Sequence, residues 1–489
     1  MTGAGPTVRE SSISALGMVG LVLGPAVFAF LSLMPAPPGL SEAGWSVAAV
    51  VALMAIWWIS QAIPLPATAL LPVILFPLLG VTDLRAATAP YAHPLIFLFL
   101  GGFIVALTIE RWNLHRRIAI AVIGFAGTKP QRLIGGFMLA TAWLSMWVSN
   151  TATTLMMVPI AISVISFIEI GDHGEPATPA HDRFARGLLI SIAYAASIGG
   201  LATLIGTPPN AFLAGYIEQN HGIEIGFAEW MLLGLPISAG ILFLAWILLT
   251  RVLFRADDLP LENVRSGISH ERMKLGRLGK AEKLTTALFF AVAILWVCRP
   301  LLDNLIPISD ITIAIAGALA AFLIPVNLRE RTFLMDWDHA KKLPWGILLL
   351  FGAGLSLAAA IDSTGLAAWL ADLLSSSAGL PLLAILLLIT AFVVFLTEIS
   401  SNTATAAVFV PVAATFAISL GFDPMTLAVP VALAASCAFM MPVATPPNAI
   451  VFSTGHLTVM QMCRAGILLN LVATAAIALS ALYLVPLVF

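Results

Sequence analysis

The stretch WVSNTATTLMMVP, Trp147–Pro159, lies inside a long apolar region of the chain, and ISSNTATAAVFVP, Ile399–Pro411, lies inside another. Both stretches contain the string Ser-Asn-Thr-Ala-Thr. The side chains of Ser, Asn and Thr carry polar groups that are costly to leave unpaired in apolar surroundings. A polar string that occurs twice in such surroundings indicates one site built from two related parts.

The composition places the chain in a membrane. Hydrophobic residues make up 60% of the 489 residues and charged residues only 10%, whereas soluble domains carry about 25% charged residues. A transmembrane helix needs about 20 predominantly apolar residues. We therefore expect eleven spans, near residues 13–35, 43–62, 65–82, 93–111, 187–216, 228–250, 284–304, 309–327, 343–362, 427–455 and 465–488.

The two regions that hold the repeated strings, 119–170 and 379–420, are too long for one span and are interrupted in the middle. The helix-compatible flanks 133–148 and 152–169 put the segment Ser149–Thr151 at the tip of a re-entrant hairpin. Interrupted segments at membrane depth are tolerated where protein shields them or where they line a watery cavity. We predict an all-α polytopic membrane protein with eleven transmembrane spans plus two re-entrant hairpins.

The distribution of Lys and Arg predicts the orientation. If the N-terminus is cytoplasmic, every Lys and Arg except Arg85 and Arg299 falls on the cytoplasmic side, as the positive-inside rule requires. We expect a cytoplasmic N-terminus and a periplasmic or extracellular C-terminus. The basic segment 251–283 is read as a solvated linker, and no basic arm indicates a nucleic-acid partner.

A second motif follows each polar string. LIGTPPNAF, Leu204–Phe212, follows the first string, and PVATPPNAI, Pro442–Ile450, follows the second. The Asn residues of the SNT strings are 402 − 150 = 252 residues apart, and those of the TPPN strings are 448 − 210 = 238 residues apart. An odd number of predicted spans separates the copies, so the two halves run in opposite directions. Inverted repeats with broken helices at the membrane midplane are a recurring plan of secondary transporters.

The chemistry of the strings suits an anion and a cation together. Helix ends leave backbone N–H and C=O groups unpaired, and helix N-termini attract anions. Exposed carbonyls, hydroxyls and amide oxygens suit a hard cation such as sodium. In TPPN, two prolines remove two N–H donors and push the residues before them out of the helical region. Each half thus brings two broken helices and bare oxygens to one depth.

Simpler interpretations exist for single occurrences. One SNT string in a transmembrane helix is typical of an interhelical hydrogen-bonding patch, whereas the paired copies favour a functional site. Ser149 or Ser401 as the nucleophile of an intramembrane hydrolase requires a nearby base, and the chain has no G-x-S-x-G motif. We predict that the protein is not an enzyme. The intramembrane acid Glu398 is a functional candidate, but we favour a structural carboxylate that is hydrogen-bonded or paired.

Duplicated SNT strings, each followed by a TPPN break, resemble the divalent-anion:sodium symporter family over nearly the whole chain. The resemblance implies a homodimer in the cell inner (plasma) membrane, in which a transport domain moves against a scaffold as an elevator. It implies sodium-coupled import of a C4-dicarboxylate such as succinate, malate or fumarate, with sulfate, citrate or 2-oxoglutarate as substrates of some members. A dicarboxylate exchanger that works without sodium, and a channel with the same broken helices, stay open as alternatives.

The resemblance also implies the site residues. The first sodium ion lies among Ser145, Ser149, Asn150 and Gly206, and the second among Thr397, Ser401, Asn402 and Ala444. The substrate carboxylates meet Asn150, Thr151, Asn402 and Thr403, with Thr207, Thr445 and Pro446 nearby. Ala444 replaces the Gly206 of the first half, and this preserves a carbonyl ligand if Ala444 avoids positive φ.

The expected domain organisation follows the two repeats. It comprises an N-terminal span with scaffold spans (1–112), the first hairpin with transport-domain spans (113–254), a cytoplasmic linker (255–283), further scaffold spans (284–364) and the second hairpin with transport-domain spans (365–489). The expected partners are a dicarboxylate dianion, at least two sodium ions, membrane lipids and a second copy of the chain.

Overall fold

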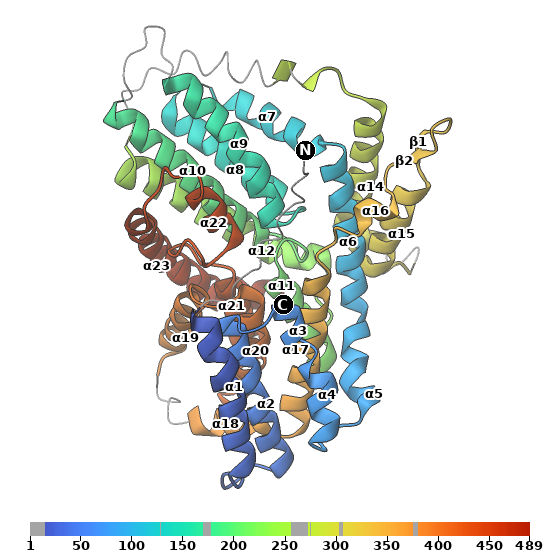
Figure 1. Ribbon diagram of the computed structural model, residues 1–489, viewed down its shortest axis with the longest axis vertical. Helices are drawn as coiled ribbons and strands as arrows, with labels where there is room; N and C mark the ends of the chain where they lie inside the picture. Colours follow the sequence, from blue (N-terminus) through green and yellow to red (C-terminus); the bar gives the residue numbers. More distant parts are fainter. Residues whose placement is uncertain are drawn as a thin grey trace, which may run out of the picture.

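The fold is a body of packed helices, seen along its short axis in Figure 1. The computed structural model describes residues 15–127, 129–169, 178–255, 272–273, 275–302, 307–374 and 380–489. Most of the linker predicted at 255–283 lies outside the described residues. Among the described residues, eight helices are long and apolar enough to cross a membrane, which confirms a polytopic helical membrane protein.

Seven of these eight helices coincide with predicted spans, and the eighth, Asn402–Ser419, is the second arm of the hairpin predicted in 379–420. The prediction is wrong for the segment 65–82, which is not one helix but two short ones. Pro72 lies at the start of the second short helix, Leu71–Leu78, and has no N–H to donate to the carbonyl oxygen of Thr68, so the first helix, Leu65–Thr68, does not run on into the second.

The N-terminal part of the chain contributes two separate packing units. α1 and α2 contact each other, and α6 runs along the opposite edge of the body against α15. The helices are α1 (Ala15–Leu33), α2 (Glu42–Ser60), α3 (Leu65–Thr68), α4 (Leu71–Leu78), α5 (Leu84–Thr88), η1 (Ala89–Ala92) and α6 (Pro94–Arg111).

The chain breaks where the first SNT string predicts a break. One helix ends at Ser145, the next begins at Asn150, and both contact the following helix, α10. The helices of this part are α7 (Leu114–Ala126), α8 (Pro130–Ser145), α9 (Asn150–Glu169), α10 (Pro179–Gly200), α11 (Pro208–His221), α12 (Phe227–Ile247) and η2 (Leu248–Leu253). The predicted span 187–216 is accordingly two helices, α10 and α11, with the TPPN break between them.

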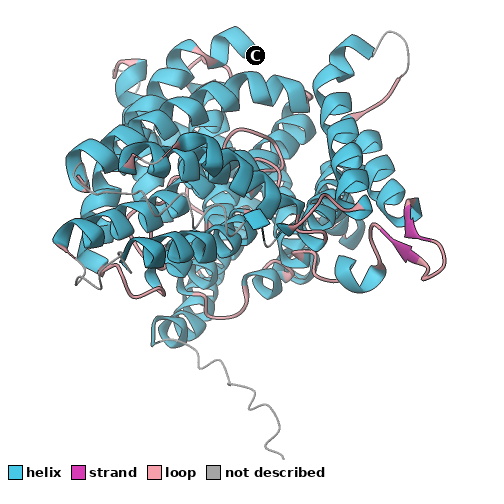
Figure 2. Ribbon diagram, turned by 90° about the horizontal axis from the view of Figure 1, so that it is seen from above, coloured by secondary structure: helices cyan, strands magenta, loops and turns pink. Residues whose placement is uncertain are grey.

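The central segment contains the only strands in the part of the chain that the structure describes. β1 (Pro325–Asn327) and β2 (Thr332–Phe333) pair antiparallel, with Pro325 opposite Phe333 and Asn327 opposite Thr332. Figure 2 shows them at the edge of the helical body. The predicted span 309–327 therefore ends early, at Leu323, because Pro325 cannot continue the helix. The protein is mostly helical, and this short hairpin is an addition that the sequence analysis did not predict. The helices are α14 (Lys280–Leu302), α15 (Asp310–Leu323), α16 (Trp337–Ala340) and α17 (Trp345–Ser363).

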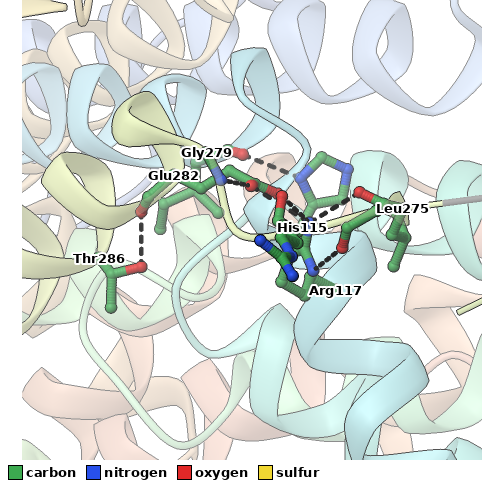
Figure 3. Close-up of polar contacts among 9 residues, drawn as sticks. His115, Arg117, Leu275, Gly279, Glu282 and Thr286 are labelled. Carbon is green, nitrogen blue, oxygen red and sulfur yellow. Dashed lines mark hydrogen bonds and ion pairs between the residues drawn. The ribbon is translucent and has the colours of Figure 1, made fainter. Parts of the chain in front are cut away.

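An ion pair joins α7 to α14. The guanidinium of Arg117 donates to Glu282 through Nε at 2.9 Å and Nη2 at 3.2 Å. It also donates to the carbonyl oxygens of Leu275 at 2.9 Å and Gly276 at 3.0 Å. Figure 3 shows Arg117 held between Glu282 and Leu275. The planar fork of arginine suits this multiple bonding, and the pair fastens the helix before the first hairpin to the start of α14.

The second half breaks as the first does. One helix ends at Thr397 and the next begins at Asn402, and the predicted span 427–455 is two helices separated by residues 436–445. The helices are α18 (Leu366–Leu374), α19 (Leu382–Thr397), α20 (Asn402–Ser419), α21 (Met425–Ala435), α22 (Pro446–Phe452), α23 (Val459–Tyr483) and α24 (Val485–Val488).

The two halves interleave. α22, which follows the second TPPN break, packs on α9 and α10 of the first half. α11, which follows the first TPPN break, packs on α20 and α21 of the second half. Each half therefore completes the other's broken-helix region.

Candidate cation and anion site

The first polar string forms a cluster of three oxygens. The Ser145 hydroxyl oxygen lies 2.6 Å from Asn150 Oδ1 and 2.7 Å from the carbonyl oxygen of Ala196, in the last turn of α10. Ser145 is fully buried. A hydroxyl has one proton to donate, while amide and carbonyl oxygens only accept. One proton therefore faces two acceptors, and the cluster holds surplus lone pairs.

The second polar string repeats this cluster. The Thr397 hydroxyl oxygen lies 2.9 Å from Asn402 Oδ1 and 2.8 Å from the carbonyl oxygen of Ala435, the last residue of α21. Thr397 is also fully buried. In both clusters the carbonyl comes from the C-terminal end of a helix, which carries partial negative charge. Oxygen-rich clusters of this kind suit a hard cation.

The first break brings Gly206 to this cluster. A Cβ atom added to Gly200 would lie 2.9 Å from Asn150 Oδ1 and 3.0 Å from the Gly206 carbonyl oxygen. Both oxygens therefore lie close to the same point of the backbone. Of the residues predicted to hold the first sodium ion, the structure brings together Ser145, Asn150 and Gly206. Ser149 stands one residue before Asn150, and its hydroxyl accepts the Ala152 N–H at 3.3 Å.

The second break repeats part of this arrangement. Thr397 and Asn402 lie together, and Ser401 directly precedes Asn402. Ala444 is not among the described residues with positive φ, so the condition for replacing glycine there is met. Gly200 and Gly206 of the first half correspond to Ala438 and Ala444 of the second, at the offset of 238.

The Asn side chain of each TPPN motif donates hydrogen bonds to the non-helical segment before it. Asn210 Nδ2 donates to the carbonyl oxygens of Gly200 at 3.1 Å and Thr203 at 2.9 Å. Asn448 Nδ2 donates to those of Ala438 at 3.2 Å and Met441 at 3.0 Å. The bonded residues lie ten and seven positions before the Asn in both halves. The Asn of TPPN therefore fixes the non-helical segment against the start of the next helix.

The predicted substrate residues lie around these breaks. Thr207, Thr403 and Thr445 are buried, and Thr151 is half-buried, whereas Pro446 is exposed. Thr207 and Thr445 have extended backbones and directly precede α11 and α22. Helix N-termini attract anions, and neither the SNT nor the TPPN strings contain or adjoin Lys, Arg or His. The site thus offers hydroxyls, amides and helix ends to an anion, without a cationic side chain.

Sequence reasoning missed the two carbonyl oxygens of Ala196 and Ala435. A backbone carbonyl leaves no mark in residue type, so only the fold assigns these two. It also missed that Asn210 and Asn448 hold the non-helical segments through side-chain hydrogen bonds. Their identical position in the repeated TPPN motif could have indicated a shared structural role. For Glu398 the structure agrees with the hydrogen-bonded carboxylate that we favoured, since the side chain is 3% exposed and accepts four hydrogen bonds.

Two copies of one broken-helix site inside a bundle of apolar helices are the plan of a secondary transporter. The model of the sodium:sulfate symporter transmembrane region matches residues 16–489. The chain therefore belongs to this family, the divalent-anion:sodium symporters, which are transporters and not enzymes.

Named relatives agree with this class, and two solved structures share the overall fold. The chain is 43% identical to a sodium-dependent dicarboxylate transporter, SdcS, of Staphylococcus saprophyticus, over 96% of this chain and 91% of the relative. It is 40% identical to SdcS of Staphylococcus aureus, over 98% and 93% of the two chains. The fold resembles the YdaH transporter of Alcanivorax borkumensis, with a TM-score of 0.57 at 15% identity over 96% of this chain and 97% of that one. It also resembles MtrF of Neisseria gonorrhoeae, with a TM-score of 0.54 at 11% identity over 97% and 95%.

Proposed function

We propose that the protein is a sodium-coupled secondary active transporter that imports a C4-dicarboxylate, such as succinate, malate or fumarate, across the inner (plasma) membrane. The observation that carries this proposal is the duplicated cluster in which one hydroxyl proton faces two acceptor oxygens, at Ser145 and at Thr397. Two such clusters supply at least two sodium sites. The name of the Staphylococcus relatives supports a dicarboxylate as the anion.

Sodium supplies the positive potential that the dianion needs. Each helix end offers about half a positive charge, which is too little to offset the desolvation of two carboxylates. Bound sodium ions fill this gap, and they also fix the ends of α8, α9, α19 and α20. Binding is therefore ordered, with sodium first and the dianion second. By linkage, the dianion raises sodium affinity by the factor by which sodium raises dianion affinity.

The assignment of residues follows from this order. Sodium binds among Ser145, Ser149, Asn150 and Gly206, and among Thr397, Ser401, Asn402 and Ala444. The dianion binds between the two sites, with its carboxylates on Asn150, Thr151, Asn402 and Thr403, beside Thr207, Thr445 and Pro446. The two SNT hairpins are re-entrant and travel with their neighbouring helices as an elevator. The eleven-span protomer works as a homodimer, with its N-terminus in the cytoplasm.

Binding measured by calorimetry tests the coupling. Purified protein is titrated with succinate in sodium chloride and in choline chloride at equal ionic strength. We expect the affinity for succinate to rise steeply with the sodium concentration. Equal affinity in choline and in sodium rules out sodium coupling. A panel with sulfate, citrate and 2-oxoglutarate then identifies the preferred dianion.

The second candidate is a dicarboxylate exchanger. The oxygen-rich clusters in both halves favour the symporter over it, because an exchanger has no need of two cation sites. Proteoliposomes loaded with succinate separate the two functions. Rapid counterflow of labelled succinate without sodium supports the exchanger, and uptake that requires an inward sodium gradient supports the symporter.

A further inference from the structure

Glu398 is a buried acid that directly follows Thr397. Its Oε1 accepts hydrogen bonds from the backbone N–H groups of Phe439 at 2.7 Å and Met440 at 2.8 Å, and from Asn470 Nδ2 at 2.8 Å. Its Oε2 accepts the Met441 N–H at 2.9 Å. The segment 439–441 is not helical, so its N–H groups need partners outside a helix. The carboxylate provides them.

These four partners match an ionised carboxylate. An ionised carboxylate only accepts hydrogen bonds, and every partner of Glu398 is a donor. Among the residues that the structure describes, no Lys, Arg or His forms an ion pair with Glu398. A buried charge is costly unless a charge of opposite sign lies near it. One residue away along the chain, the cluster at Thr397 gathers oxygens that suit a cation.

The first half has no such charge. The offset that relates Asn402 to Asn150 takes Glu398 to 398 − 252 = 146, which is Met146. The carbonyl oxygen of Met146 accepts a hydrogen bond from the Thr203 hydroxyl at 2.6 Å. Thr203 is the counterpart of Met441, since 441 − 238 = 203. The same junction is therefore tied by a neutral hydrogen bond in the first half and by a carboxylate in the second.

We propose that Glu398 is a positioning residue that makes the second-half sodium site, at Thr397, Ser401 and Asn402, tighter than the first-half site, so that the second-half site fills first. This rests on the proposed sodium-coupled function. The carboxylate acts through its charge and through the segment 439–441, and it does not touch the ion. As an order of magnitude, two unit charges about 10 Å apart at an effective dielectric constant of about 20 interact strongly enough to change an affinity about tenfold.

The test compares three variants by their sodium affinity without substrate. Glu398→Gln removes the charge and keeps an oxygen for three of the four donors, so it should raise the sodium concentration for half-saturation about tenfold. Glu398→Asp keeps the charge and should stay nearer to the wild type. Asn470→Ala removes one hydrogen bond without removing the charge and should leave sodium affinity within about twofold. If Asn470→Ala and Glu398→Asp weaken sodium as much as Glu398→Gln does, Glu398 is only structural.

The ratio of sodium to lithium affinity distinguishes a loss of the Glu398 charge from a distortion of the sodium site. A charge that does not touch the ion attracts sodium and lithium alike, so Glu398→Gln should weaken both by the same factor. A distorted site changes the ratio of the two affinities. Equal affinities of wild type and Glu398→Gln for both ions overturn the proposal.

A second pair of variants leaves Glu398 in place, which keeps the test valid if Glu398→Gln does not fold. Ser145→Ala should retain the higher-affinity sodium site, which lies in the second half, and Thr397→Ala should lose that site. The opposite ranking overturns the proposal. Failure of the proposed function looks different, because wild-type protein would then bind succinate equally well with and without sodium.

Discussion

The hydroxyl oxygens of Thr207 and Ser436 lie 3.1 Å apart in the buried centre of the protein, although 229 residues separate them in the chain. Thr207 directly precedes α11, and Ser436 directly follows α21. The break of the first half and the break of the second half therefore meet at one hydrogen bond. A ligand that moves one of these segments must also move the other.

A double-mutant cycle measures this link. Thr207→Val keeps the shape of the side chain and removes the hydroxyl, and Ser436→Ala removes its partner. We expect each single variant to destabilise the protein, because a buried hydroxyl loses its partner at a cost of about 1–3 kcal/mol. The double variant should cost less than the sum, with a coupling of at least about 0.5 kcal/mol. Thermal unfolding of the four proteins gives the values, and strict additivity contradicts a direct bond.

The hydroxyl in each oxygen cluster should be required for sodium. Ser145→Ala and Thr397→Ala each remove a hydroxyl oxygen, one of the proposed sodium ligands, from a cluster of three oxygens. We expect the sodium concentration for half-maximal succinate uptake to rise about tenfold or more, as for a lost interaction of about 1.4 kcal/mol. High sodium should partly restore uptake. Thr397→Ser keeps the hydroxyl and serves as the matched control; a loss as large as that of Thr397→Ala contradicts the role of the hydroxyl.

The glycine pair of the first half should not tolerate a methyl group. A Cβ atom added to Gly206 would lie 2.5 Å from the Gly200 carbonyl oxygen, so Gly206→Ala forces the backbone apart beside Asn150. Overpacking of this kind costs about 1–3 kcal/mol, and sodium-dependent uptake should fall at least tenfold. In the second half Ala444 already carries a methyl group. Ala444→Gly should therefore be mild, and uptake assays on both variants test the asymmetry.

The pair Arg117–Glu282 should stabilise the protein without serving the site. Both side chains are largely buried, at 21% and 15% exposure. Arg117→Ala removes the guanidinium from the carbonyls of Leu275 and Gly276 and from the Glu282 carboxylate, which keeps the Gly279 N–H at 2.6 Å. We expect a loss of about 1–3 kcal/mol, seen as a lower melting temperature with unchanged succinate affinity. Arg117→Lys keeps the charge but not the fork and should be intermediate. Lys341→Ala, in the exposed pair with Asp338, should change little.

Cysteine labelling tests the proposed orientation. Met273 is 72% exposed at the end of the linker, and Met34 is 46% exposed after α1. After the native cysteines Cys298, Cys437 and Cys463 have been replaced, Met273→Cys should react with a membrane-impermeant thiol reagent only from the cytoplasmic side. Met34→Cys should react from outside intact cells. The reverse pattern means that the topology is inverted.

The duplicated motifs were enough to predict the breaks in the helices. Ser149-Asn150-Thr151 and its copy lie where α8 gives way to α9 and α19 to α20, because the polar strings interrupt otherwise apolar helices. The prolines of 65–82 carried the same information, but hydropathy over the whole segment concealed them. The strands β1 and β2 are too short to leave a periodic signal.

The composition of the site was only partly predictable. Ser145 and Thr397 were predicted from the resemblance to the family, and each lies four residues before the Ser of its string. The carbonyls of Ala196 and Ala435 cannot, since any residue type offers the same group. The contact between Thr207 and Ser436 depends on how the two halves pack, which no local pattern encodes. Glu398 was visible as a buried acid, but its four donors come from α23 and from a segment about forty residues away.

The interleaving of the two halves has a consequence for biosynthesis. α9 and α10 emerge from the ribosome long before their packing partner α22, and α11 emerges long before α20 and α21. Helices can enter the membrane one after another, but the first broken-helix region lacks its covering surface until nearly the whole chain has been made. Contacts between distant segments form late because the intervening chain must first be closed into a loop. A nascent chain that stalls before residue 446 therefore lacks α22 and leaves the polar ends of the first broken helices uncovered.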